Sequence, residues 1–210
     1  MGTVEVFLRK VGIDARQIAN EIEKLSLYLG PRREVTVADL DAIVASTRVS
    51  AMWDLLDAVG ERNSAEGLNA LRDLLSQKES PIGIVMSIAG RIRELALYRE
   101  ALDQGWVRLR QIQKDRYSAE WGSVPPAVDS FFAGDMKRDP RSLHQFFVSK
   151  MVGQAARHSA RSLRANQRMV LATYERLVST SVSPATLLDI MLTRLTSSAR
   201  VDSGRDSAKV

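Results

Sequence analysis

The spacing of apolar residues constrains the fold of this 210-residue chain more than any other feature of its sequence. Apolar side chains recur every three or four residues almost throughout, and strict alternation over five or more residues is rare. A period of about 3.6 residues is typical of amphipathic helices, whereas strands alternate with a period of about two. With 45% hydrophobic residues, the chain has enough apolar side chains to bury a core. We therefore expect an all-α fold.

Capping signals mark where several of these helices begin. Most of these signals pair a polar residue with a capping partner or with a proline at the first helical position. The signals are Asp14 with Gln17, Thr36 with Asp39, Ser80 with Pro81, Ser159, and Ser183 with Pro184. Together with the apolar spacing they predict a bundle of about nine helices joined by short connections. A division into two packed units near residue 49 is left open.

Two segments depart from this pattern. In residues 104–141, Trp106, Leu109 and Ile112 follow at intervals of three, and glycines and prolines then become frequent. For this segment we expect a helix, a loop and a second short helix around 128–132. Residues 197–210 are polar and aperiodic, and we predict a disordered tail there.

The composition excludes several kinds of chemistry. The chain has no cysteine, which excludes disulfides, thiolate zinc sites and cysteine nucleophiles. His144 and His158 have no carboxylate at metal-ligand spacing, so we interpret both as ordinary packed or surface residues and expect no metal site. Neither Gly-x-Gly nor Gly-Lys-Ser/Thr occurs in the sequence, so we expect no cofactor and no ATP hydrolysis.

The chain also lacks the signals that direct proteins into or across membranes. No apolar stretch approaches the ~20 residues of a membrane-spanning helix. The first ten residues contain neither a long apolar run nor a small-residue cleavage site, which argues against a secretory signal. We therefore expect a cytoplasmic protein with no membrane contact.

Three carboxylates share one predicted helix face. Asp54, Asp57 and Glu61 occupy positions i, i+3 and i+7, where they would be able to bind a cation or act as an acid and a base. A solvated or ion-pairing face is the simpler interpretation and the one that we prefer. We assign no catalytic residue.

The clearest charge feature is a basic segment in the second half of the chain. Residues 136–176 contain nine Lys or Arg and two Asp or Glu, whereas the whole chain has a net charge of +5. Arg161, Arg164 and Arg168 share one helix face, and Arg157 lies just before them. Such a stripe suits sequence-independent phosphate contacts, an acidic protein partner, or plain solvation. The sequence leaves all three interpretations open.

The order of the residues adds a family resemblance. Residues 12–28 (GIDARQIANEIEKLSLY), 35–40 (VTVADL) and 53–59 (WDLLDAV) resemble the delta subunit of the bacterial DNA polymerase III clamp loader. The Asn-Glu-x-Glu-Lys-Leu run that begins at Asn20 is the most specific part. Looser similarity covers most of the remaining chain apart from residues 104–141, although Tyr174 and Val178 stand where the family pattern leads us to expect Asp and Lys.

The resemblance implies a domain organisation. A delta subunit has an N-terminal AAA+ module, a small helical lid and a helical collar domain, and this chain resembles the lid and the collar. Residues 1–48 would then be a partial lid-like helical domain, residues 49–196 a helical-bundle collar domain, and residues 197–210 a tail. Because the match begins inside the lid, we expect a fragment or a late-start reading frame. The clamp contact and most of the DNA contact belong to the N-terminal module in that family and are not expected here.

The resemblance also implies a function. The chain would be a non-catalytic clamp-loader subunit that contributes to collar assembly of the loader pentamer during DNA replication, within a DNA-directed DNA polymerase holoenzyme. Its partners would be the other loader subunits, and DNA binding would be weak. Asn20, Glu21 and Lys24 would dock the lid on a neighbouring module, or else form a local cap and a surface ion pair. Arg157, Arg161, Arg164 and Arg168 would contact another loader subunit or DNA. The alternative is a free-standing helical nucleic-acid-binding adaptor that uses the basic helix face.

Overall fold

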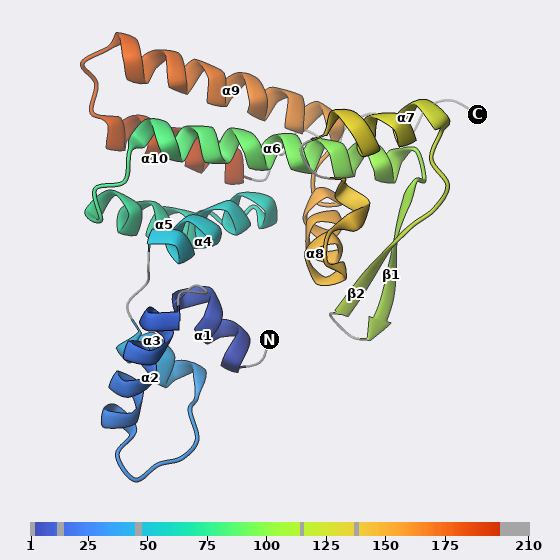
Figure 1. Ribbon diagram of the computed structural model, residues 1–210. Coiled ribbons are helices and arrows are strands. Elements are labelled where there is room, and N and C mark those ends of the chain that lie inside the picture. Colours follow the sequence, from blue (N-terminus) through green and yellow to red (C-terminus); the bar gives the residue numbers. More distant parts are fainter. Residues whose placement is uncertain (1–2, 12–14, 45–47, 114–115, 137–138, 198–210) are drawn as a thin grey trace.

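The computed structural model describes residues 3–11, 15–44, 48–113, 116–136 and 139–197. The protein is mostly helical, which confirms the predicted fold class (Figure 1). In chain order the helices are α1 (Thr3–Val11), α2 (Ala15–Leu29), α3 (Val37–Ile43), α4 (Arg48–Glu61), α5 (Ser64–Ser76), α6 (Pro81–Asp103), α7 (Pro126–Ser130), α8 (Gln145–Ala155), α9 (Ala160–Ser179) and α10 (Pro184–Thr196). A π-helical turn, η1 (Phe131–Asp135), follows α7, and a 3₁₀ turn, η2 (Pro140–Ser142), precedes α8.

Most of the predicted helix starts are confirmed. Thr36 and Asp39 form a capping box at the start of α3. The Ser80 side chain accepts a hydrogen bond from Gly83 N–H at the start of α6, and Ser159 caps α9. The Asp14 cap lies outside the described residues. Helix α1 had no counterpart in the sequence-based prediction, because no capping signal precedes it.

The buried apolar residues of the described segments form two clusters. The smaller cluster joins α1, α2 and α3 through Val6, Phe7, Val11, Leu25, Leu40 and Val44. The larger one joins α4, α5, α6, α8, α9 and α10, and its fully buried members include Leu55, Leu74, Ile88, Leu95, Met151 and Leu188. Each cluster buries apolar side chains from its own segment of the chain, as expected for two separate hydrophobic cores.

Helix α6 is the central element of the larger cluster. It packs against α9 on one side and against α8 and α4 on others. Figure 1 shows α9 running antiparallel to α6 along much of its length, with α4 and α5 on the opposite side of α6. Because α6 has neighbours on several sides, its apolar residues extend around most of its circumference, including Ile84, Val85 and Ile92. Part of its surface nevertheless stays exposed, and that part borders α9.

A β-hairpin replaces the helix that we predicted after residue 104. Strands β1 (Val107–Gln113) and β2 (Arg116–Trp121) pair antiparallel, with Leu109 opposite Ala119. Val107 and Ala119 are buried, whereas Arg108 and Glu120 are exposed. The interval of three between Trp106, Leu109 and Ile112 misled the prediction, because the alternation Val107-Arg108-Leu109-Arg110 is the strand signal. The short helix expected around 128–132 is present as α7 and η1.

Candidate interface for a protein partner

Three of the four predicted basic residues lie on one exposed surface of α9. Helix α9 buries Leu163, Asn166, Val170 and Thr173, and helical spacing places Arg161, Arg164 and Arg168 on the opposite side. All three arginines are exposed, as is Arg157 in the turn before α9. None of these four guanidinium groups forms an ion pair with another residue of the described segments. Their charge is therefore available to an anionic partner.

Next to this basic surface, α6 and α9 enclose a shallow apolar groove of about 280 Å³. Its lining residues come from both helices and are Val85, Met86, Ala89, Arg93, Gln167, Val170, Leu171 and Tyr174. Met86 is 52% exposed and Leu171 is 58% exposed, and both line the groove together with Tyr174, so the exposed apolar surface is contiguous. The sequence analysis did not predict this groove. Periodicity alone cannot tell an apolar residue that faces the core from one that is exposed.

The proposed lid-docking residues lie on α2. Asn20 and Lys24 are exposed, and Lys24 Nζ pairs with Glu21 Oε1 at 2.7 Å across one helical turn. Oε2 of the Glu21 carboxylate is buried and has no hydrogen-bond partner among the described residues. The ion pair that we expected as the simpler interpretation is thus present, and the docking role stays a prediction.

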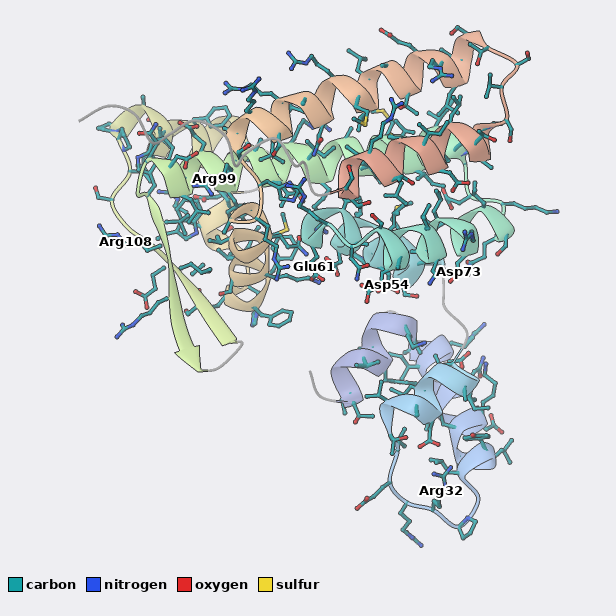
Figure 2. The ribbon with its side chains drawn as sticks, turned by 180° about the vertical axis from the view of Figure 1, so that it is seen from behind. Arg32, Asp54, Glu61, Asp73, Arg99 and Arg108 are labelled. Atoms are coloured by element: carbon teal, nitrogen blue, oxygen red, sulfur yellow. The ribbon has the colours of Figure 1, made fainter. Side chains whose placement is uncertain are left out.

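The three acidic residues of α4 do not converge on a site. Asp57 is buried, with Oδ1 accepting hydrogen bonds from Arg91 Nη1 at 3.5 Å and Gln154 Nε2 at 3.3 Å, and with Oδ2 bonded to Lys150 Nζ. Asp54 and Glu61 lie apart along α4 (Figure 2). Because cationic and amide donors occupy both oxygens of Asp57, its carboxylate is an ion-pairing group, in line with the interpretation that we preferred.

The two histidines have local structural contacts. The His144 ring nitrogen Nδ1 accepts a hydrogen bond from Phe146 N–H at 3.3 Å and so caps α8. His158 is buried, and its Nε2 lies 2.9 Å from the Gly60 carbonyl oxygen. Burial lowers the pKa of His158 below its ordinary value, and the Coulombic effect of Arg62 and Arg157 lowers the pKa further. Within the described segments, no group of three or more His, Asp or Glu side chains is arranged to hold a metal ion.

One segment of the chain matches a known protein family. Residues 50–116 match the model of the DNA polymerase III delta subunit, C-terminal domain. In this segment the chain is similar to that family. The resemblance inferred from the sequence is confirmed for this region, which comprises nearly all of α4, then α5, α6 and β1. The segment therefore contributes one wall of the apolar groove, namely α6.

A sequence match and a structural match, both in Bacillus subtilis, extend the comparison. The chain is 32% identical over 89 residues to DNA polymerase III subunit delta of strain 168, an alignment that covers 42% of this chain and 26% of that protein. The solved structure of the Bacillus subtilis DNA clamp loader delta protein (YqeN) superposes with a TM-score of 0.57 at 23% identity. That superposition covers 92% of this chain and 50% of the other, so the chain spans about half the length of that delta protein. At this identity, the superposition shows a shared fold.

None of the described helices combines the length and the apolar character that a membrane crossing requires.

Proposed function

We propose that this chain is a collar-forming part of a clamp-loader delta subunit and has no catalytic centre of its own. The observation that carries the proposal is the match of residues 50–116 to the C-terminal domain of the delta family. Assembly of a helical collar requires complementary surfaces rather than a reactive group. The exposed apolar groove beside α6 supports this role, because contiguous exposed apolar surface with a polar rim is typical of interaction sites.

The proposal includes a domain organisation and a set of partners. Residues 1–48 form a lid-like helical unit, residues 49–196 form the collar domain, and residues 197–210 form a tail. The partners are the other clamp-loader subunits, the setting is cytoplasmic DNA replication, and contact with the sliding clamp is left to a module that this chain does not resemble. The separate apolar clusters of α1–α3 and α4–α10 support the first boundary.

Reconstitution tests the proposed function. The purified chain is mixed with the other clamp-loader subunits of the same organism, and complex formation is followed by size-exclusion chromatography with light scattering. We expect the chain to elute with those subunits at a stoichiometry of one per assembly. A chain that elutes alone at every concentration would contradict the proposal.

The nucleic-acid adaptor is the second candidate, and the unpaired arginines of α9 favour it. Phosphate contacts by Arg161, Arg164 and Arg168 would give an affinity for DNA that is independent of sequence and decreases steeply with salt. DNA affinity of the intact chain and of its triple alanine variant, measured at two salt concentrations, separates the candidates. Clear binding at moderate salt that the triple variant loses would favour the adaptor, whereas weak binding by both favours the collar.

A further inference from the structure

The groove between α6 and α9 has two chemically different ends. The two helices run antiparallel (Figure 1), so Met86 of α6 lies near the end where α9 contributes Leu171 and Tyr174. Arg93 and Gln167 line the other end. The groove therefore changes from apolar to basic along its length.

Exposed side chains extend the apolar end beyond the groove itself. Val178, one helical turn after Tyr174, is 59% exposed, and Ile82, one turn before Met86, is also exposed. Residues at i, i+3 or i+4, and i+7 form a continuous ridge on a helix, so Leu171, Tyr174 and Val178 present one ridge. Two antiparallel helices with such ridges form a channel into which the apolar side of a third helix fits.

Unpaired cations mark the basic end. Arg93 forms no ion pair with another described residue, and neither do Arg164 and Arg168, which flank the lining residue Gln167 on α9. At the rim of an apolar interface, such charges select a partner of opposite sign and fix its orientation. The complementary surface is therefore apolar at one end and acidic at the other.

We propose that this groove binds an amphipathic helix of a neighbouring clamp-loader subunit, with apolar side chains against Met86, Leu171 and Tyr174 and acidic side chains against Arg93, Arg164 and Arg168. The proposal rests on the proposed function, to which it adds the contact surface and the chemistry of the partner. A second copy of this chain is a poorer occupant. A twofold pairing of this surface, with the helices parallel, would bring the arginines of both copies together, and no acidic residue lines the groove to neutralise them.

The test uses the full chain and the purified complex of the other clamp-loader subunits as the probe. Two groove variants are compared with the unaltered chain: Arg93→Glu/Arg168→Glu for the basic end and Leu171→Asp for the apolar end. Arg72→Glu on α5 is the matched control, since Arg72 is exposed and its side chain contacts the neighbouring Asn69. Because the altered side chains are exposed, each variant is expected to keep the circular dichroism spectrum and melting temperature of the unaltered chain.

The two groove variants are expected to behave differently with salt. Leu171→Asp should weaken binding by about 100-fold, as expected for a central apolar contact. Arg93→Glu/Arg168→Glu should weaken binding about tenfold or more at low salt, and its affinity should change less with salt than that of the unaltered chain. Arg93→Lys should retain most of the affinity, because it keeps the charge.

Three other outcomes would contradict the groove proposal, the proposed function, or both. If the unaltered chain joins the complex and both groove variants join it equally well, the groove proposal is wrong and the collar function stands. If the unaltered chain does not join, the proposed function and the groove partner are both wrong. A concentration-dependent dimer of the chain that Leu171→Asp abolishes would show instead that a second copy occupies the groove.

Discussion

Arg91 of α6 is buried against Asp57 of α4, with Nη1 3.5 Å from Oδ1, at the point where α4, α6 and α8 meet. The same nitrogen donates to Gln154 Oε1 at 2.9 Å, and Lys150 of α8 pairs with the other oxygen of Asp57. Buried charges are tolerated only when their partners are held in place, so this network requires one relative arrangement of the three helices. We infer that it positions α8 against α4 and α6, and hence the hairpin that contacts α8.

Removal of the carboxylate should strongly destabilise the fold. In Asp57→Ala, the buried guanidinium group of Arg91 keeps only the exposed Glu94 as an anionic neighbour, 3.7 Å from its Nε, and Lys150 loses its partner. Breaking a buried ion pair on one side typically costs about 3–5 kcal/mol in the free energy of unfolding. Urea unfolding monitored by circular dichroism measures the change. Asp73→Asn, at an exposed position of α5, is the control and should change the unfolding free energy by less than about 0.5 kcal/mol.

Gly60→Ala tests how closely α4 approaches α8. A Cβ atom at Gly60 would lie 2.3 Å from Gln154 Oε1, and this amide is held by its hydrogen bond to Arg91. The amide cannot move away without breaking that bond, so we expect destabilisation of about 1–3 kcal/mol. Gly153→Ala on α8 is the matched control, because nothing lies within 4 Å of a Cβ atom there. That variant should be stabilised by about 0.5–1 kcal/mol, and equal effects of the two substitutions would refute the close approach.

The hairpin should loosen when α8 loses two polar side chains. Ala119 of β2 is buried; its N–H donates to Ser149 Oγ at 3.0 Å, and its carbonyl oxygen accepts from Gln145 Nε2. In Gln145→Ala/Ser149→Ala, both backbone groups lose their partners, which typically costs about 1–3 kcal/mol for each buried group. Hydrogen exchange measured by mass spectrometry should become faster in β1 and β2 and stay unchanged in α9. Ser179→Ala, which removes a bond within α9 alone, should leave exchange in the hairpin unaltered.

Acid should weaken the fold through His158. Burial lowers the pKa of His158 below 6.5, so the unfolded chain binds more protons than the folded chain between the two pKa values. The contribution of this ring to the free energy of unfolding therefore has its full value above about pH 6.5. It decreases as the pH falls toward the pKa of His158 in the folded chain. Unfolding free energies at about pH 7.5 and about pH 5.5 should differ less in His158→Gln than in the unaltered chain. An unchanged pH dependence in His158→Gln would argue against His158 as the source.

Most of the helical fold was predictable from local sequence. The capping box of Thr36 and Asp39 and the Ser80-Pro81 start of α6 depend on residues three positions apart or adjacent, so their physical effect is contained within the sequence itself. The hairpin was not predicted, because Leu109 and Ile112 satisfy a helical interval. Its strands are stabilised by pairing and by contacts with α8, which lies more than twenty residues later in the chain.

The candidate interface likewise has one part that the sequence predicted and one part that depends on the tertiary structure. By itself, the sequence determined the exposed arginine stripe of α9, since the helical period of Leu163, Val170 and Thr173 leaves Arg161, Arg164 and Arg168 on the opposite side. Only the tertiary structure decided that Asp57 is an ion-pairing residue and that Met86 and Leu171 border one groove. The physical reason is that charge and apolarity are properties of a residue, whereas burial depends on which helices pack beside it. Those neighbours are brought together by contacts between residues far apart in the chain, such as the ion pair of Asp57 with Lys150.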